Sequence, residues 1–423
     1  MFLCLPLIGF GQGWINYYND VAETGGVTIR QTTDLGYLIL GDNIIKTNNN
    51  GDTLWKLDYP ASDGFQTTDG GYIACEYWGY GSFVRFDAQG DTLWTKNYKG
   101  ASIVDANDGG FVFINSSISG NPFRNEQFNT KSDKSSKQIN LFKIDSLGSL
   151  LWSKTYFPYQ LYTSNSAKSL IKTYDDGYMI FGSHPLGYSY FDGHLIKTDM
   201  NGDTLWTKGY NFGKVSQGIQ TIDSGYIFTG NVDTADVNNS VYLLKTNSLG
   251  GQEFVKTFQH PNPSVYDEIY PSSVNQTNDG GYIMTLTIEE NNWHDWGKIY
   301  VIKTNSLGDT LWTNTFCNAT CGMMYRGANN IQQTADGGYI LTGVYWDGSF
   351  NSSNEPDENG MSTIVIKINH LGNLTSTQHI SLSNNNGELL KVTDLLGRET
   401  KQTNQPLFYI YNDGTVEKRI IIE

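Results

Sequence analysis

Two segments combine the aromatic and acidic side chains that ligand recognition needs. Residues 289–296 read EENNWHDW, and residues 344–348 read VYWDG and are followed by the acidic segment EPDE at 355–358. Aromatic rings beside carboxylates suit a sugar or a cation. We therefore predict that a ligand is bound by Trp293, His294, Asp295, Trp296, Trp346 and Asp347. The alternative is that both segments simply pack as loops over the ends of the fold.

Catalytic and metal-binding patterns do not stand out in the sequence. The six histidines occur at no repeated spacing and without a HExxH pair, and neither a GxxxxGK loop nor a GxSxG elbow is present. The Asx-rich turn at 48–52 resembles a calcium loop only in part, because it lacks the bidentate Glu. We expect no catalytic residues, no metal site and no cofactor. Structural calcium in such turns is the one alternative left open.

Three of the four cysteines lie beyond the N-terminal segment. Cys317 and Cys321 stand close together in FCNATCG, whereas Cys75 lies in the apolar segment GYIAC. An exported chain meets oxidising conditions, so one disulfide and one spare thiol are expected. We predict that Cys317 and Cys321 are bridged and that Cys75 is a core residue.

The composition favours a β-rich globular protein and argues against a nucleic-acid partner. The chain of 423 residues contains 46 Gly and 13% aromatic residues, which is too aromatic for a disordered chain and too rich in glycine for a helical one. Its 28 Lys and Arg face 43 Asp and Glu, and this net charge of −15 repels a phosphate backbone.

Three short motifs occur seven times each, and this repetition decides the fold. The first is of the type Thr-x-Asp-Gly-Gly-Tyr, with its aromatic residue at Tyr37, Tyr72, Phe111, Tyr178, Tyr226, Tyr282 and Tyr339. The second is Lys-x-Asx-x-x-Gly, with Arg85 once in place of Lys, and its glycines are Gly51, Gly90, Gly148, Gly202, Gly250, Gly308 and Gly372. The third is Trp-x-x-x-Tyr or a Phe variant of it, beginning at Trp14, Trp55, Trp94, Trp152, Trp206, Phe254 and Trp312.

Each repeat predicts four short antiparallel strands, a to d. Asp-Gly-Gly between apolar residues indicates an a–b hairpin, and the Asx-x-x-Gly segment indicates a c–d hairpin. Seven such units of roughly 40 to 60 residues predict an all-β, seven-bladed β-propeller, and a β-solenoid is the less favoured alternative. A lone d strand at 14–18 precedes the first full unit while the last unit lacks one. We therefore expect the N-terminal strand to close the ring.

The two hairpin turns of every repeat are expected on one face of the ring. The b–c loops, whose lengths vary widely, then lie on the opposite face, where recognition loops would be. The Trp and Tyr of each d strand point to one side of the strand and are expected to wedge between neighbouring blades rather than to stack on a ligand.

The N-terminal segment indicates export. Residues 1–11 are apolar and end in Gly-Phe-Gly, the pattern of a secretory signal and its cleavage site. Basic residues do not precede the apolar stretch, so the signal is either truncated at its start or weak, and a buried first strand is the alternative. No later segment approaches the roughly 20 apolar residues of a membrane-spanning helix.

The C-terminal segment shares no motif with the repeats. Residues 376–386 are a Ser/Thr/Asn-rich linker, and 387–423 read as a small β module of three short strands, with DLLGR at 394–398 and a Lys-Arg pair before the last apolar residues. This module resembles the C-terminal sorting domain of type IX secretion substrates in Bacteroidetes, and the repeats of 12–375 are similar to Asp-Gly-Gly-Tyr propellers of such secreted proteins. The resemblance implies a sorting signal made of Asp394, Leu395, Leu396, Gly397, Arg398, Asp413, Gly414, Lys418 and Arg419.

Taken together, these features predict a monomeric protein that is exported through the periplasm and is secreted or held at the outer-membrane surface. We expect a scaffold that binds a glycan or a surface protein, with the type IX secretion machinery as a further partner. The alternative is a hydrolase or lyase acting on polysaccharide. Such an enzyme needs two carboxylates roughly 5 to 10 Å apart at the mouth of the central channel.

Overall fold

The computed structural model describes most of the repeat region and three strands near the C-terminus. The structural statements below concern residues 13–18, 28–76, 81–117, 138–156, 166–185, 191–232, 240–259, 268–289, 297–316, 328–346, 361–374, 389–393, 406–411 and 416–420. The chain divides into two units, Met1–Thr375 and Ser376–Glu423, and each is described by itself.

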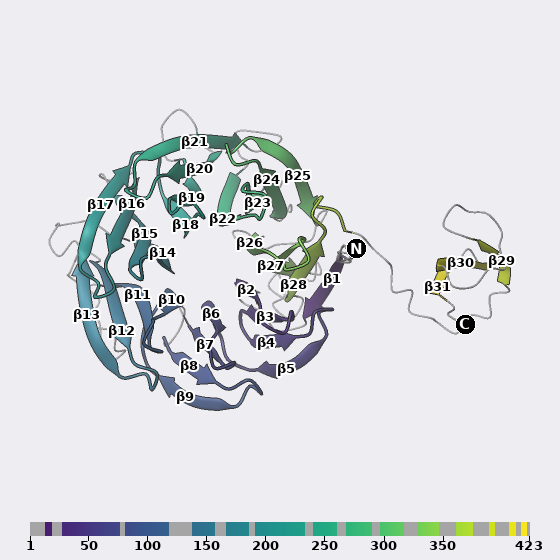
Figure 1. Ribbon diagram of the computed structural model, residues 1–423, viewed down its shortest axis with the longest axis horizontal. Helices are drawn as coiled ribbons and strands as arrows, with labels where there is room; N and C mark the ends of the chain where they lie inside the picture. The colour runs from purple at the N-terminus through teal and green to yellow at the C-terminus, as the bar shows by residue number, and fades with distance from the viewer. Residues whose placement is uncertain are drawn as a thin grey trace, which may run out of the picture. The chain divides into compact units, whose positions relative to one another are not determined.

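Seven four-stranded antiparallel sheets stand around a ring, which confirms the seven-bladed β-propeller (Figure 1). Blades one to three consist of β2 (Thr28–Gln31), β3 (Tyr37–Leu40), β4 (Ile44–Thr47), β5 (Thr53–Leu57); β6 (Asp63–Gln66), β7 (Tyr72–Cys75), β8 (Phe83–Phe86), β9 (Thr92–Lys96); and β10 (Ser102–Asp105), β11 (Phe111–Ser117), β12 (Gln138–Ile144), β13 (Leu150–Tyr156). Blades four to six consist of β14 (Ser166–Lys172), β15 (Tyr178–Pro185), β16 (Phe191–Thr198), β17 (Thr204–Tyr210); β18 (Val215–Gln220), β19 (Tyr226–Asn231), β20 (Ser240–Thr246), β21 (Gln252–Gln259); and β22 (Glu268–Gln276), β23 (Tyr282–Glu289), β24 (Lys298–Thr304), β25 (Thr310–Phe316). Blade seven consists of β26 (Ala328–Gln333), β27 (Tyr339–Trp346), β28 (Met361–Ile368) and β1 (Trp14–Tyr18). The described residues contain no helix.

The N-terminal strand closes the ring, as predicted. β1 pairs antiparallel with β28, from Trp14 opposite Lys367 to Tyr18 opposite Thr363. Figure 1 shows β1 at the outer edge of blade seven and beside blade one. A core cluster crosses this junction, because Ile39 of blade one and Val365 of blade seven belong to it together.

The core lies between the blades. Strands b and c are buried along their length because neighbouring blades cover both of their faces; β3 (YLIL) and β20 (SVYLLKT) contain no exposed residue. The outer d strands alternate instead. In β17 (TLWTKGY) the side chains of Trp206, Lys208 and Tyr210 are at least partly buried, whereas their neighbours face solvent.

The second unit contains a three-stranded antiparallel sheet. Its strands β29 (Leu389–Thr393), β30 (Pro406–Tyr411) and β31 (Val416–Ile420) pair in sequence order.

Every a–b turn needs one residue with a positive φ angle. Glycine supplies it in four blades, where φ lies between 78° and 87°, at Gly70, Gly109, Gly280 and Gly337. The other three blades place Leu35, Asp176 and Ser224 there, with φ between 63° and 65°. A left-handed conformation costs an L residue about 1–2 kcal/mol, so these three turns carry strain that the others avoid.

Removing β1 tests the closure of the ring. A chain that starts at residue 20 leaves the outer edge of β28 unpaired, and we expect a lower melting temperature and self-association in size-exclusion chromatography. Deleting β29, a strand of the same length in the second unit, is the matched control and should change neither property of the propeller. A truncated chain that stays monomeric with unchanged melting would contradict the closure.

Restoring glycine tests the strain in the turns. Leu35→Gly should raise the free energy of unfolding by about 0.5–1 kcal/mol, because relief of the left-handed strain outweighs the entropy that glycine adds to the unfolded chain. Gly280→Leu is the converse variant, because a side chain on Gly280 has open space and tests the backbone alone. Denaturant titration measures both, and a loss of stability in Leu35→Gly would refute the assignment.

Candidate binding groove on the turn face

One ion pair recurs in all seven blades and joins the first two sequence motifs. The cation of strand c reaches the Asp of the a–b turn at 2.6–2.9 Å, in the pairs Lys46–Asp34, Arg85–Asp69, Lys143–Asp108, Lys197–Asp175, Lys245–Asp223, Lys303–Asp279 and Lys367–Asp336. The cationic side chains are almost fully buried, whereas the carboxylates are partly exposed. The sequence showed both motifs, but their pairing was not predicted.

The second glycine of each Asp-Gly-Gly turn makes room for this cation. A side chain on Gly281 would collide with the carbonyl oxygen of Thr304 and come within 2.7 Å of Lys303 Nζ. That Nζ donates to Asp279 and also, at 2.8 Å, to the Thr304 carbonyl. One ammonium group therefore ties the a–b turn to the strand that leads into the c–d turn.

These bonds lower the pKa of the turn carboxylates. In Asp223, partial burial acts to raise the pKa, but hydrogen bonds from Lys245, Thr221 and the Gly225 amide outweigh it and leave the pKa below its ordinary value. The pKa is lowered in the same direction in all six counterparts, Asp34, Asp69, Asp108, Asp175, Asp279 and Asp336.

The third motif locks each blade to the c–d turn of the next, which confirms the wedge interpretation. Tyrosine hydroxyls donate to glycine carbonyls at 2.6–2.8 Å in the pairs Tyr18–Gly51, Tyr98–Gly148, Tyr156–Gly202 and Tyr210–Gly250. The ring at the start of the motif packs on the same glycine, as Trp206 does on Gly250. In two blades the indole also donates to a turn carbonyl, from Trp55 to Ala88 at 3.2 Å and from Trp94 to Ser146 at 3.0 Å.

Blade five departs from this pattern. Its d strand has Glu253-Phe254 where blades one to four and six have Leu-Trp. Lys245 pairs with Phe254 and Thr246 with Gln252, so Glu253 is the extra residue of a β-bulge. A bulge redirects the side chain it carries, and here the Glu253 carboxylate accepts a hydrogen bond from Lys245 at 2.9 Å.

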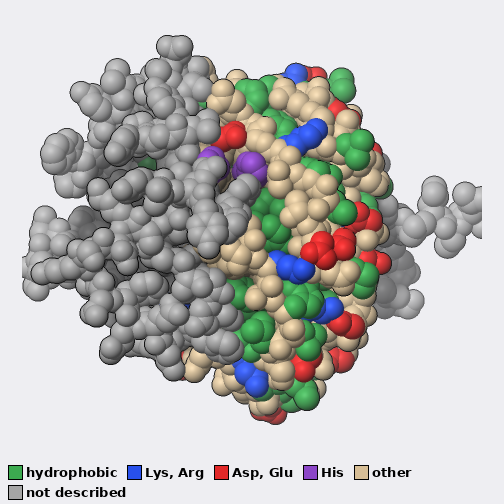
Figure 2. All heavy atoms as spheres, turned by 90° about the vertical axis from the view of Figure 1, so that its left-hand side faces the viewer, with side chains coloured by type: hydrophobic (Ala, Val, Ile, Leu, Met, Phe, Trp, Pro, Cys, Tyr) green, Lys and Arg blue, Asp and Glu red, His purple; other side chains and the backbone are tan. Residues whose placement is uncertain are grey.

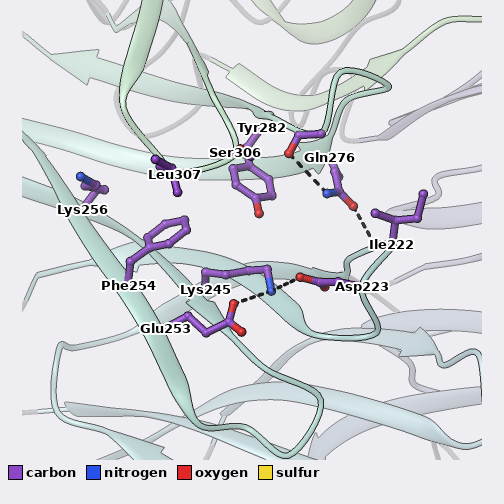
Figure 3. A pocket seen from close by; sticks show the side chains of 11 residues that line it. Ile222, Asp223, Lys245, Glu253, Phe254, Lys256, Gln276, Tyr282, Ser306 and Leu307 are labelled. Carbon is purple, nitrogen blue, oxygen red and sulfur yellow. Dashed lines mark hydrogen bonds and ion pairs between the residues drawn. The ribbon is translucent and has the colours of Figure 1, made fainter.

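A groove of ≈ 600 Å³ lies at this departure, between blades five and six. Figure 3 shows Lys245 between Asp223 and Glu253, with the rings of Phe254 and Tyr282 beside them. The two ring centroids are 6.3 Å apart. Burial, with smaller contributions from Asp223 and Glu253, raises the pKa of Tyr282 to about 12, so its hydroxyl keeps its proton at neutral pH. The groove thus combines an aromatic wall with charged groups.

The electrostatics of the groove are set by paired charges. Lys256 pairs with Asp309 at 2.8 Å, which repeats the contact between Lys154 and Asp203 elsewhere in the ring. Figure 2 shows the same mixture of acidic and basic side chains on the described part of the outer surface. Lys245 donates to Asp223, Glu253 and the Thr246 carbonyl, which uses all three of its protons.

Blade four contains titratable side chains outside the groove, on its strands β15 and β16. His184 pairs with Asp192 in the register of β15 and β16, and His194 follows two residues later on the same face. Burial raises the pKa of Asp192 and lowers that of His194 to about 4. Within the described residues, no set of three or more His, Cys, Asp and Glu side chains is placed to hold a metal ion.

Most of the residues predicted to bind a ligand lie outside the described residues. This holds for Trp293, His294, Asp295, Trp296 and Asp347. Trp346 is the last residue of β27, and its backbone pairs with Met361. The ligand site on these residues stays a prediction. The sequence signal for the groove is the Phe variant of the third motif at Phe254, which by itself indicates one more repeat and not a site.

The predictions for the cysteines and the tail are tested only in part. Cys75 is buried and carries a free thiol, which confirms its place in the core. Cys317 and Cys321 lie outside the described residues, so their disulfide stays a prediction. In the tail, Lys418 and Arg419 lie in β31, whereas 394–398, Asp413 and Gly414 lie outside the described residues. No helix in the described parts of the chain is long and apolar enough to cross a membrane.

Comparisons with known proteins show no family for this chain. No protein-family model matches the chain, and no curated protein matches its sequence. A Dyadobacter fermentans protein of unknown function is 10% identical at a TM-score of 0.46, over 85% of this chain and 98% of that one. The periplasmic gluconolactonase of Pseudomonas aeruginosa is 10% identical at a TM-score of 0.46, over 85% of this chain and 99% of that one. Drosophila Semaphorin 1b is 8% identical at a TM-score of 0.47, over 85% of this chain and 87% of that one. Likeness at this level carries no conclusion about function.

The lowered pKa values of the seven turn carboxylates predict how stability depends on pH. Unfolded Asp titrates near pH 3.9, and the folded carboxylates titrate lower, so the unfolded chain binds more protons in this window. The contribution is therefore complete well above pH 4 and is lost as the pH falls through the folded values. We expect a melting temperature that is nearly constant from pH 7 to about 5 and decreases below about 4. Asp→Asn at residues 34, 175 and 279 should flatten that decrease, and an unchanged acid slope would contradict the role of the ion pairs.

Proposed function

We propose that this protein is an exported binding scaffold, held at the cell surface or released, and not an enzyme. The groove between blades five and six is the observation that carries the proposal. It is built where one blade departs from the repeat, it offers the exposed Glu253 and the rings of Phe254 and Tyr282, and it is set in a rigid ring. Rigid placement of a few polar groups beside aromatic surface is the usual construction of a binding site.

The hydrogen bonding of the groove supports recognition over catalysis. Lys245 donates all three of its protons to oxygen acceptors of the protein, so its nitrogen has no free position at which to meet a reacting group. Asp223 has a lowered pKa and stays ionised at neutral pH. These groups hold fixed charges that a ligand can meet. The loops around Trp293 and Trp346, which are expected on the opposite face, would be a separate recognition surface for a glycan or a surface protein.

Export is proposed from the two ends of the sequence. Residues 1–11 fit a secretory signal, and 387–423 resemble a type IX sorting domain. A sorting tail should act independently of the propeller, and the division of the chain into the units Met1–Thr375 and Ser376–Glu423 is in keeping with that. The proposed partner of the tail is the type IX secretion machinery of the outer membrane.

Removing residues 387–423 tests whether this segment directs the protein to the cell surface. In a bacterium with a type IX system, the chain without residues 387–423 should fold with unchanged melting but stay in the periplasm, where added protease does not reach it in intact cells. Arg398→Ala is a milder variant that should reduce display in the same direction. Normal surface exposure of the truncated chain would refute the export proposal.

Binding is tested with the purified propeller on glycan and peptide arrays, alongside a polysaccharide hydrolysis screen. We expect retained ligands on the arrays and no product in the screen. Product release that survives further purification would instead support the alternative of a polysaccharide-acting enzyme.

A further inference from the structure

The repeat itself supplies the reference for blade five. The five Leu-Trp pairs are Leu54-Trp55, Leu93-Trp94, Leu151-Trp152, Leu205-Trp206 and Leu311-Trp312. Each of these leucines is an exposed bulge residue, as Leu205 and Leu311 are at 57% exposure. In blade five the same position carries Glu253, and the indole is reduced to the phenyl ring of Phe254. Two substitutions therefore distinguish this groove from the equivalent positions.

Loss of the indole removes the ring N–H that donates to the next blade's turn in two of the five Leu-Trp blades, at Trp55 and Trp94. The carbonyls that accept from Trp55 and Trp94, those of Ala88 and Ser146, lie two residues before the turn glycine of the following blade. The equivalent carbonyl in blade six is that of Ser306. Phe254 packs on Gly308 as the tryptophans pack on their glycines, but a phenyl ring has no proton to donate. None of the described residues donates to the Ser306 carbonyl.

Glu253 also leaves the groove with one uncompensated negative charge. Asp223 is neutralised by Lys245, as in every other blade, and Asp309 is neutralised by Lys256. Glu253 adds a carboxylate to Lys245, which already has its partner. The Glu253 side chain is 44% exposed, so a ligand can reach it.

We infer that the groove binds a guanidinium group. A guanidinium is planar like the missing indole, and it carries N–H donors in its plane and a positive charge. Its face can stack on the ring of Phe254, and the positive charge of the guanidinium strengthens this contact. Its edge can donate to the Ser306 carbonyl and the Glu253 carboxylate. An ammonium group offers the charge without the plane. The assignment rests on the proposed binding function and names the ligand chemistry of the same groove.

The test uses N-acetyl-arginine methylamide as the probe for an arginine side chain and methylguanidine as the probe for a free guanidino compound, titrated into the full chain by ligand-observed NMR. We expect saturable binding of both, with the capped arginine tighter if the partner is a peptide. The neutral isostere N-acetyl-citrulline methylamide and N-acetyl-lysine methylamide should each bind at least about tenfold more weakly. Equal binding of citrulline, or no binding of either guanidinium probe, would overturn the assignment.

The repeat provides variants that should fold. Glu253→Leu with Phe254→Trp rebuilds the pair found in five other blades, so we expect melting no lower than that of the parent chain and a loss of binding of at least about tenfold. Glu253→Gln removes the charge alone and should weaken binding in the same direction. Unchanged binding in either variant would exclude the groove.

The converse experiment introduces the Glu-Phe pair of blade five into another blade. Leu151→Glu with Trp152→Phe in blade three builds a second copy beside the existing pairs of Lys143 with Asp108 and Lys154 with Asp203. Two bound probes per chain would support the inference, and one would refute it. Failure of these titrations would refute the guanidinium assignment alone, whereas the scaffold proposal fails only if the arrays retain no ligand of any kind.

Discussion

A buried cation beneath each a–b turn is the interaction on which the propeller depends. Its nitrogen binds the turn carboxylate and, in blades such as the sixth, the carbonyl that leads into the c–d turn, so one side chain fixes both hairpins of a blade. The cation is almost dry while its carboxylate stays partly in water, which limits the desolvation that a fully buried pair would require. Glycine at the second turn position is the steric condition for this contact.

The fixed position of these hairpin turns determines how neighbouring blades join. A tyrosine hydroxyl or an aromatic ring can engage a glycine of the next blade only if that glycine is held at a constant position, and the cation beneath the turns provides this. The arrangement also explains why blade five tolerates change. Lys245 retains its hydrogen bonds to Asp223 and the Thr246 carbonyl when Glu253 is added, and Phe254 still packs on Gly308. The contacts that close the propeller are therefore retained, and only the surface of blade five changes.

The sequence predicts features that repeat and misses those that depend on a neighbouring blade. Seven copies of three motifs were enough for the fold, the closure by β1 and the packing role of the d-strand aromatics. The cation–carboxylate pair could have been found as well, since Arg85 replaces lysine without loss of charge in a motif that occurs as often as the Asp-Gly-Gly turn. The groove could not, because it requires knowing that a bulge turns Glu253 toward Lys245 and that Phe254 faces a turn far along the chain. The a–b turn motif could be recognised in three blades although Leu35, Asp176 and Ser224 stand there in place of glycine at the position with a positive φ angle.

Closure by β1 has a consequence for the order of events in folding. Trp14 finds its partner, Lys367, only after all seven blades have been synthesised, so the contact with the greatest sequence separation forms last. Until then the growing chain has two unpaired edges and incomplete inter-blade cores, which is the state in which such proteins aggregate or are held by chaperones. Once the ring is closed, no terminal blade remains to fray, and unfolding must begin by breaking into a continuous circle. We therefore expect the pairing of β1 with β28 to slow folding and to make the finished ring resist opening.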